Sequence, residues 1–316
     1  MPGYCDAVDA LAAVLAAAGV RGTIAATLNA ADPWGLDLDD IPGAAFHAVT
    51  EGTAWLCLPG RPDIRLAAGD VVLLPTGTAH VLASVPDAST MPFDRAAAQA
   101  ALAAGQELHV GCGQPQTRIL CASYRQDPAI TLPLLSLLPD LLHIPAVRAS
   151  PALDTTLRLL AQEIAQPAPG SAAVLDRIVD ILLVQVLRTW LAASPPPVHG
   201  PSWLGALTDP VAGPALAVLH TRPGHEWTVA SLAAATGVSR ATLARHFPAT
   251  VGDTPAAHLT RWRMDLAAQR LRDSNDTVST IARAVGYTSQ YAFSRAFTRA
   301  RGTSPGRYRT QSRRRP

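Results

Sequence analysis

The sequence predicts an α+β protein, in which an N-terminal β-sandwich or β-barrel is followed by helices and by an all-α C-terminal region. Three observations predict this fold. Short apolar runs separated by turn residues fill residues 46–84, helical periodicity replaces them from Leu132, and the last hundred residues contain a helix-turn-helix pattern twice. With 316 residues, 48% of them hydrophobic, the chain is long enough for two or three folded domains.

The barrel is expected within residues 1–128. Strands are predicted at 47–58, 64–66, 71–74 and 117–125, each bounded by turn residues. In the last of these, Ile119 and Cys121 share one face and Leu120 and Tyr124 the other. Residues 85–115 are rich in Ala, Gly and polar residues, and we expect a long surface insertion there.

A helical segment is predicted for residues 129–194. Its strongest pattern covers residues 171–193, where large apolar residues recur at helical spacing: Leu175, Ile178, Leu182, Val186 and Trp190. This apolar stripe either packs against its own barrel or forms a dimer interface, and one helix can do both. Residues 195–209 begin with three prolines and are expected to form a linker.

A duplicated unit organises residues 210–312. Residues 277–297 and 228–247 align as two short helices joined by a turn. Thr277 and Thr228 are suited to cap the first helix, and glycines at 286 and 237 suit a turn with positive φ. We therefore expect two helix-turn-helix units joined by a long helix over residues 254–271.

The second helix of each unit has an apolar face and an outward face. Leu243 and Phe247 are spaced i and i+4, as are Phe293 and Phe297, so both pairs are expected in the core. The outward residues are the candidates for contacts with bases in a DNA groove: Arg240, Ala241, Ala244, Arg245, Gln290, Tyr291, Ser294 and Arg295. Phosphate contacts are expected from the helix starts and from nearby arginines: Thr228, Thr277, Arg261, Arg263, Arg307 and Arg309.

The charge is divided unequally along the chain. Residues 210–316 hold sixteen Arg against five Asp and Glu, a net charge of +11, whereas residues 1–209 carry −9. Only the C-terminal region is therefore suited to a polyanion such as DNA.

The C-terminal region resembles the AraC/XylS family of bacterial transcription regulators. Gly286-Tyr287, the run from Phe293 to Phe297 and the stretch at 302–309 follow the family signature in order and spacing. The resemblance implies a cytoplasmic, nucleoid-associated homodimer that binds promoter DNA. It also implies regulation of transcription without enzymatic activity, and we expect an activator that contacts RNA polymerase.

The N-terminal region is similar to the cupin-type sensor domain of one branch of that family, and this resemblance implies that the predicted sandwich or barrel is a small jelly-roll β-barrel. Residues 69–80, with a Pro-x-Gly turn before His80, resemble the second cupin motif, and His47 resembles a histidine of the first. The usual His-x-His pair is incomplete because Ala45 and Val49 flank His47, and Glu51 is the nearest candidate for the family's glutamate ligand.

Several effectors are compatible with this domain. A metal such as zinc suits a site formed by two nitrogens and one or two sulfurs: His47, His80, Cys112 and Cys121. Alternatively, Cys112 and Cys121 form a redox switch, or Trp34 and Trp55 line a pocket for a small organic molecule.

Two other functions compete with regulated transcription. A cupin metalloenzyme tethered to DNA would use His47 and His80. The sequence contains no second carboxylate and no group of residues around a nucleophile that would support catalytic turnover. A nonspecific architectural protein would bind promoter and random DNA alike. The N-terminal residues lack a basic signal-peptide region, no apolar run reaches transmembrane length, and four Cys are few for the length. We expect no membrane partner.

Overall fold

The computed structural model describes residues 19–39, 43–126, 134–166, 168–193 and 201–313, together with the single positions 11, 15 and 41. Two predicted segments lie partly outside these residues: an amphipathic helix over residues 1–19, predicted from apolar residues interspersed with Asp6 and Asp9, and residues 195–200 of the linker. The chain divides into two compact units. We call residues 21–125 with 138–193 the sensor unit, and the part described from residue 201 onward the helical unit.

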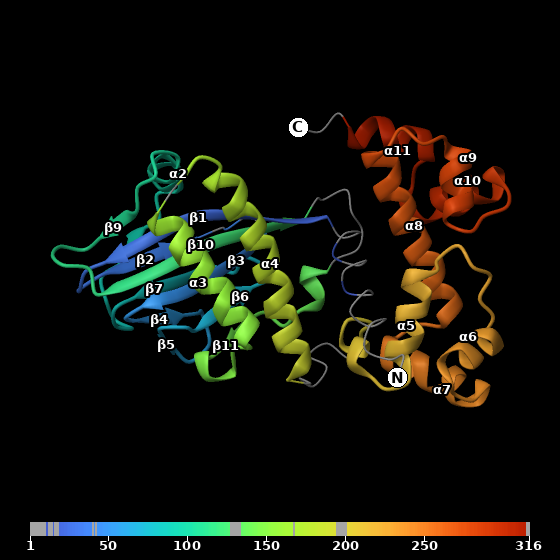
Figure 1. Ribbon diagram of the computed structural model, residues 1–316, viewed down its shortest axis with the longest axis horizontal. Helices are drawn as coiled ribbons and strands as arrows, with labels where there is room; N and C mark the ends of the chain where they lie inside the picture. Colours follow the sequence, from blue (N-terminus) through green and yellow to red (C-terminus); the bar gives the residue numbers. More distant parts are fainter. Residues whose placement is uncertain are drawn as a thin grey trace. The chain divides into compact units, whose positions relative to one another are not determined.

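The sensor unit contains short strands and two long helices (Figure 1). Its first elements are β1 Val20–Ala30, β2 Gly35–Leu38, β3 Ala44–Glu51, β4 Thr53–Cys57, β5 Ile64–Ala67, β6 Val71–Leu74, β7 His80–Ala83 and β8 Met91–Pro92. They are followed by α2 Arg95–Ala103, β9 Leu108–Val110, β10 Thr117–Gln126, β11 Leu142–Ile144, the 3₁₀ turn η2 Ala146–Arg148, α3 Pro151–Ala165 and α4 Ser171–Ala192. The 3₁₀ turn η1 Leu135–Leu137 precedes β11.

The strands form two sheets rather than one closed barrel. One sheet has six strands in the order β11-β6-β3-β10-β1-β9, and the other has five in the order β5-β4-β7-β2-β8. Strand β3 lies between β10 and β6, so that His47 is opposite Cys121 on one side and Val72 on the other. Gly52 separates β3 from β4 at φ +75, where an added Cβ would lie 2.2 Å from the carbonyl oxygen of Gln116.

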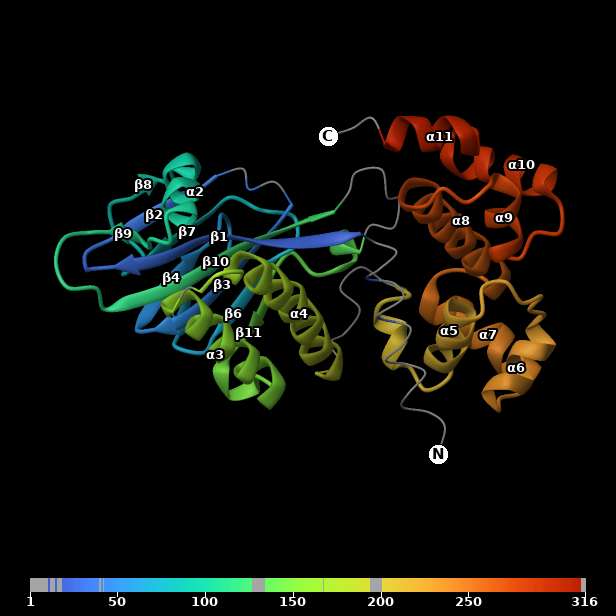
Figure 2. The same ribbon diagram turned by 45° about the horizontal axis from the view of Figure 1, so that its top comes forward.

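The core of the sensor unit lies between the two sheets. Alternation along β10 places Ile119 and Cys121 on one face, as predicted, and this face lies in the core together with Leu56 and Leu82 of the other sheet. The opposite face of β10 is also buried, and the Tyr124 hydroxyl donates a 2.8 Å hydrogen bond to the Val179 carbonyl of α4. Helices α3 and α4 therefore cover the six-stranded sheet, as Figures 1 and 2 show.

Residues 85–115 are more ordered than the predicted surface insertion. Asp94 caps α2, β9 pairs in parallel with β1, and Ala98 and Val110 are buried in the sensor core. The signal for the helix is an Asp followed by a run rich in Ala, which has the highest helix propensity.

Helix α4 buries most of its predicted apolar stripe within its own unit. Ile178, Leu182 and Val186 are each at most 3% exposed, as the intramolecular alternative requires. Val174 and Ile181 remain exposed on the same helix. None of the helices that the structure describes is long and apolar enough to cross a membrane.

The helical unit contains the 3₁₀ turn η3 Gly205–Thr208 and the helices α5 Ala212–Thr221, α6 Val229–Thr236, α7 Arg240–Val251, α8 Pro255–Asp273, α9 Val278–Ala284, α10 Gln290–Arg301 and α11 Pro305–Ser312. Residues 201–209, assigned to the predicted linker, pack in this unit. Trp203 and Leu204 are buried, and the Ser202 amide donates a 3.0 Å hydrogen bond to the Thr250 carbonyl.

Candidate functional site

Two helix-turn-helix units are built from α6 with α7 and from α9 with α10. All four helices have N-caps: Thr228 and Thr277, as predicted, and Ser239 and Ser289 at the starts of the second helices. Each of these side chains accepts the backbone N–H of the third residue that follows it. Each cap satisfies a donor that the first helical turn leaves free. The sequence thus fixes where each recognition helix begins.

The turns between the helices depend on glycine. Gly237 and Gly286 have φ of 71 and 84, in the left-handed region that the pattern predicts. A Cβ at Gly286 would lie 2.7 Å from a guanidinium nitrogen of Arg263 and 2.8 Å from the Gly224 carbonyl oxygen. The second turn is therefore restricted both in conformation and in space.

The recognition helices α7 and α10 have the predicted division of faces. Leu243, Phe247, Phe293 and Phe297 are fully buried. The predicted DNA-contacting residues are exposed, except for half-buried Ser294: Arg240, Ala241, Ala244, Arg245, Gln290, Tyr291, Ser294 and Arg295. Tyr291 is 72% exposed, and the Arg295 guanidinium lies 5.8 Å from its ring centre. Arg, Gln and Tyr at these positions are available to a DNA groove.

The residues predicted to contact phosphate fall into two groups. Thr228, Thr277 and Arg307 are exposed, and Arg261 is exposed but forms an ion pair with Asp253. The other two arginines stabilise the unit internally. Arg263 donates to the carbonyls of Pro223 and His225 at 2.7 and 2.9 Å, and Arg309 donates to the Asp276 carbonyl. Their phosphate contacts remain a prediction.

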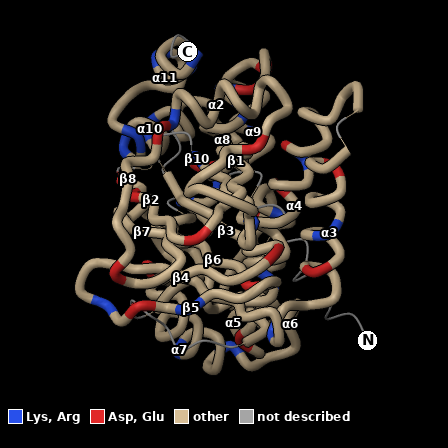
Figure 3. Tube along the Cα trace, turned by 90° about the vertical axis from the view of Figure 1, so that its left-hand side faces the viewer, with Lys and Arg blue, Asp and Glu red and all other residues tan. Residues whose placement is uncertain are grey.

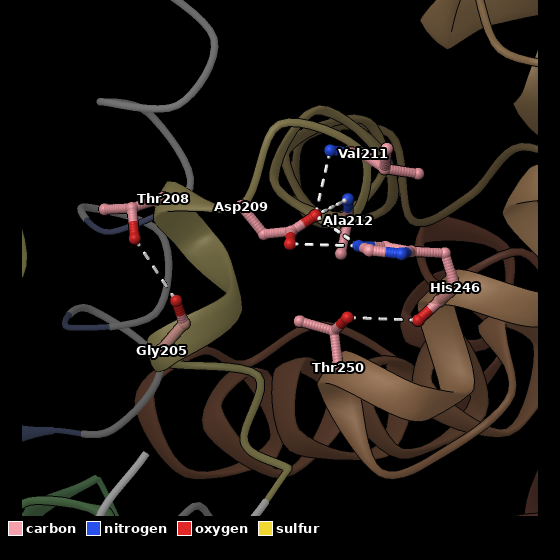
Figure 4. A network of polar contacts seen from close by, with 7 residues as sticks. All are labelled: Gly205, Thr208, Asp209, Val211, Ala212, His246 and Thr250. Atoms are coloured by element: carbon pink, nitrogen blue, oxygen red, sulfur yellow. Dashed lines mark hydrogen bonds and ion pairs between the residues drawn. The ribbon is translucent and has the colours of Figure 1, made fainter. Parts of the chain in front are cut away.

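Asp209 connects α5 to the first recognition helix (Figure 4). Its carboxylate accepts the amides of Val211 and Ala212 at 2.9 and 2.7 Å, and Nε2 of His246 on α7 at 3.0 Å. Burial raises the pKa of Asp209, but the hydrogen bonds from Ala212, His246 and Val211 outweigh it and hold the pKa below its usual value. The carboxylate is therefore charged at neutral pH and positions α7.

Positive charge is concentrated on the second recognition helix and the helix that follows it. In Figure 3 the backbone at Arg residues is blue, and blue segments lie near α10 and α11. Helix α10 contains Arg295, Arg299 and Arg301 and no acidic residue. This distribution favours a polyanionic partner.

The sensor core contains a polar cluster formed by His47, His80 and Cys121. His47 Nδ1 lies 3.1 Å from the Cys121 sulfur, and His47 Nε2 lies 2.8 Å from His80 Nε2. His80 Nδ1 lies 2.7 Å from the Thr78 carbonyl oxygen. Burial, reinforced for His47 by His80, lowers the pKa of both histidines, and burial raises the pKa of the Cys121 thiol to about 12.

These contacts determine which nitrogens carry protons when all three groups are neutral. A carbonyl only accepts, so His80 Nδ1 carries its proton and His80 Nε2 is an acceptor. His47 Nε2 must then donate, which leaves His47 Nδ1 to accept the Cys121 S–H. The cluster is a continuous chain of hydrogen bonds in which every polar group has a partner.

The cluster does not fit the predicted metal site. Cys121 and His80 contact opposite nitrogens of the His47 ring, so the three side chains do not converge on one point. Cys112 is exposed, and Glu51 forms an ion pair with Arg118. Within the described part of the chain, no group of three His, Cys, Asp or Glu side chains could hold a metal ion.

A cavity of about 60 Å³ reaches this cluster at His47 and Cys121. Its other lining residues combine apolar side chains with Arg, Gln and hydroxyl groups: Ile24, Ala25, Leu38, Ile41, Phe93, Ala122, Thr23, Ser123, Arg95, Gln99 and Arg125. Trp34 and Trp55, the residues predicted to line an effector pocket, are not among them. Trp34 is instead packed in the core, 2% exposed.

The predicted redox pair is not formed as a disulfide. Cys112 and Cys121 are both free thiols, one exposed and one buried. The raised pKa keeps Cys121 protonated at neutral pH, which makes it a poor nucleophile.

Comparison with known proteins agrees with this architecture. Residues 9–192 match a family model described as cupin, and residues 232–311 match one described as a helix-turn-helix domain. A putative AraC-like transcription regulator of Streptomyces lividans is 37% identical over 95% of this chain and 98% of its own. The chain belongs to the AraC-like family of transcription regulators. It is accordingly a DNA-binding regulator with a cupin effector domain, and its relatives are regulators rather than enzymes.

Two further proteins are similar to this AraC-like regulator. The Escherichia coli RCS-specific transcriptional activator RclR is 30% identical over 96% of this chain and 98% of its own. The DNA-binding domain of AdpA, solved in complex with a target DNA, is 33% identical and covers 34% of this chain and 98% of that one, with a TM-score of 0.32.

The sequence did not point to several residues of these two sites. Arg95 and Gln99 line the sensor cavity but belong to the stretch that was predicted to be a surface insertion. Asp209 and His246 connect α5 and α7, although they are 37 residues apart. A helix predicted from Asp94 and the alanines that follow it would have indicated Arg95 and Gln99. No local sequence pattern indicates the contact between Asp209 and His246.

Proposed function

We propose that this AraC-like regulator is a sequence-specific transcription activator that binds spaced half-sites in promoter DNA as a homodimer. One observation carries this proposal: two N-capped recognition helices expose side chains that are able to hydrogen-bond to base edges. In a cytoplasmic, nucleoid-associated dimer, two such pairs of helices would cover a long site. Contact with RNA polymerase would provide activation.

The test begins with selection of binding sites from random duplexes. We expect the full-length protein to bind a selected site at least about a thousandfold more tightly than a scrambled duplex, measured by fluorescence anisotropy at fixed salt. Equal affinity for both would instead support nonspecific architectural binding. Transcription of a selected promoter with purified polymerase then tests activation, and a decrease would make the protein a repressor.

Substitutions assign the contacts to individual residues. Arg295→Ala should weaken specific binding by about 1–3 kcal/mol and relax the preference at one base pair. Arg158→Ala is the matched control, because Arg158 is exposed on α3 and forms a surface ion pair with Asp154. If both substitutions have the same small effect, α10 does not read bases as proposed.

We further propose that a small organic effector occupies the sensor cavity and changes the population of dimers that fit the spaced half-sites. The cavity combines apolar walls with hydrogen-bonding groups, as small-molecule sites do, but its volume of about 60 Å³ is several times smaller than theirs, so binding must enlarge it. Metal analysis of the reduced protein distinguishes this trigger from a metal. We expect well below one ion per chain, whereas one ion per chain that His80→Ala abolishes would make the metal the effector.

A further inference from the structure

Helix α8 changes its packing partners near its midpoint. On one side, the Trp262 indole N–H donates a 3.3 Å hydrogen bond to the His220 carbonyl of α5, which packs against α6 and α7. On the other side, Met264 and Leu271 belong to the apolar core that α8 shares with α9, α10 and α11. We call α5–α7 the first half of the helical unit and α9–α11 the second half. The two recognition helices therefore lie in different halves, which α8 joins (Figure 1).

Arg263 lies at this midpoint and contacts both halves. Its guanidinium donates to the carbonyls of Pro223 and His225 at 2.7 and 2.9 Å, in the loop between α5 and α6. It also lies 5.9 Å from the ring centre of Tyr287, which follows α9 in the turn before α10. A guanidinium suits this position, because its planar fork donates several hydrogen bonds in fixed directions and can also stack on an aromatic ring. One side chain thus connects a loop of the first half to a turn of the second.

The two segments also approach each other directly. A Cβ on Gly286 would lie 2.8 Å from the Gly224 carbonyl oxygen and 2.7 Å from a guanidinium nitrogen of Arg263. A Cβ on Gly224 would lie 3.4 Å from the Ala284 carbonyl oxygen, which is an ordinary contact. The turn of the second half therefore has room for this loop and for Arg263 only because residue 286 is glycine.

Each end of this connection is fixed to a helix-turn-helix unit. In the loop, the Trp227 indole N–H donates to the Arg222 carbonyl at 3.1 Å, and Thr228 caps α6 directly afterwards. In the turn, the Tyr287 ring lies against that of Phe293 on α10, with ring centres 5.7 Å apart. Movement of one half relative to the other would therefore disrupt the connection.

The connection restricts a movement that a single helix allows. Long helices curve, and α8 alone would hold the two halves at an angle that varies with its bending. A second contact beside the helix opposes this bending. The geometry matters for DNA, because recognition helices that enter successive major grooves on one face of B-DNA must lie about 34 Å apart, one helical turn. An inserted base pair would rotate one groove segment relative to the other by about 35°.

We propose that Arg263 is a positioning residue that sets the spacing of the two base-pair segments recognised by one chain. The proposal rests on the sequence-specific DNA binding proposed above. In this role Arg263 acts through α7 and α10 and need not touch a base. The planar guanidinium is required, whereas the phosphate contact predicted from the sequence would require only its charge.

The experiment uses the full-length protein and the selected duplex. The base pairs at which Arg245→Ala and Arg295→Ala relax the preference mark the two recognised segments, and one base pair is inserted between them. Measured by fluorescence anisotropy, the wild type should lose at least about tenfold in affinity on insertion, and Arg263→Lys at most about threefold. Lysine keeps the charge, so the salt dependence of binding should not change.

Arg313→Lys is the matched control. The Arg313 guanidinium donates to the Arg272 carbonyl at 3.1 Å and to the Asn275 side chain at 3.0 Å, at or just beyond the C-terminal end of α8. These contacts do not involve the first half, so this variant should keep the full loss on insertion. A wild type that tolerates the insertion, an Arg263→Lys variant that keeps the full loss, or a control that loses discrimination as well would overturn the proposal.

Hydrogen exchange of the DNA-free protein separates failure of this proposal from failure of the proposed function. Arg263→Lys should accelerate amide exchange by at least about threefold in both connected segments, residues 222–228 and 284–288, whereas Arg313→Lys should accelerate it in neither. Equal binding of selected and scrambled duplexes by the wild type would refute sequence-specific binding alone. Exchange that changes in only one segment, or in neither, would refute the connection through Arg263.

Discussion

At the scale of single residues, the hydrogen-bond chain through Cys121, His47 and His80 predicts defined tautomers. The Thr78 carbonyl fixes the proton on His80 Nδ1, and the proton on His47 Nε2 follows from it. We expect nitrogen–proton spectra at neutral pH to show two neutral rings with opposite tautomers.

Variants test the order of this chain. His80→Phe removes the acceptor for His47 Nε2–H and should release that ring to either tautomer, whereas Cys57→Ser changes a cysteine outside the cluster and should leave both tautomers unchanged. Observation of the same tautomer for His47 and His80 in the wild type would contradict the chain.

Buried histidines also predict how stability depends on pH. The pKa of His258 falls from 6.5 to about 4 on folding, and those of His47, His80 and His220 are lowered as well. The unfolded chain thus binds more protons below pH 6.5. Stability should be constant above 6.5 and decrease as pH falls towards 4, by roughly 3 kcal/mol for His258 alone.

Urea unfolding at several pH values measures this decrease. The variant His258→Gln should have a smaller pH dependence than the wild type in the transition of the helical unit. A transition midpoint that stays constant between pH 7 and pH 5 would refute the assignment of neutral buried rings.

The sequence predicted which residue types form the sensor cluster better than it predicted which residues are in contact. His47 and His80 were expected in one site and are in contact, because both occupy inward positions on strands of facing sheets. Cys112 was grouped with them by type alone, although it lies on an exposed loop. Strand alternation predicts the face of a side chain, but the distance between two loops depends on the packing of the whole unit.

At the scale of elements, Asp209 predicts a coupling between the start of α5 and helix α7. Asp209→Ala removes two amide hydrogen bonds and the contact with His246 (Figure 4), and should lower the unfolding free energy by about 1–2 kcal/mol. DNA affinity should also decrease, because α7 carries Arg240 and Arg245.

The control for this prediction is Asp273→Ala. Asp273 is half-exposed and contacts only its neighbour Arg272 among the ion pairs described, so its loss should change stability by less than about 0.5 kcal/mol. If denaturant unfolding gives equal losses for the two variants, Asp209 is an ordinary surface cap and does not position α7.

Elements with strong local signals were predicted from the sequence. The four caps and the turn glycines specify both helix-turn-helix units within a few residues, so the structure confirms their positions. Helix α2 was missed because most of its residues are alanine, which is also common in loops, and β9 was missed because it has only three residues. The structure of this segment depends on the pairing of β9 with β1, which lies some eighty residues earlier in the chain.

At the scale of the whole molecule, the surface of α4 predicts the oligomeric state. Most of its apolar residues are buried in the sensor unit, but Val174 and Ile181 remain 41% and 46% exposed and lie seven residues apart, on one face of the helix. A second copy of the chain covering this face would remove them from water. We therefore expect a dimer through α4 at micromolar concentration.

Sedimentation velocity tests this interface with a matched pair of variants. Ile181→Arg places a charge on the exposed face of α4 and should shift the protein from dimer to monomer, with weaker binding to the paired half-sites. Val147→Arg makes the same change at a valine that is 91% exposed on η2, outside α4, and should leave the dimer intact. Val174 and Ile181 are the exposed large apolar residues of α4. If the wild type remains monomeric, or if the dimer tolerates Ile181→Arg, the dimer that binds the paired half-sites must therefore form through a surface other than α4.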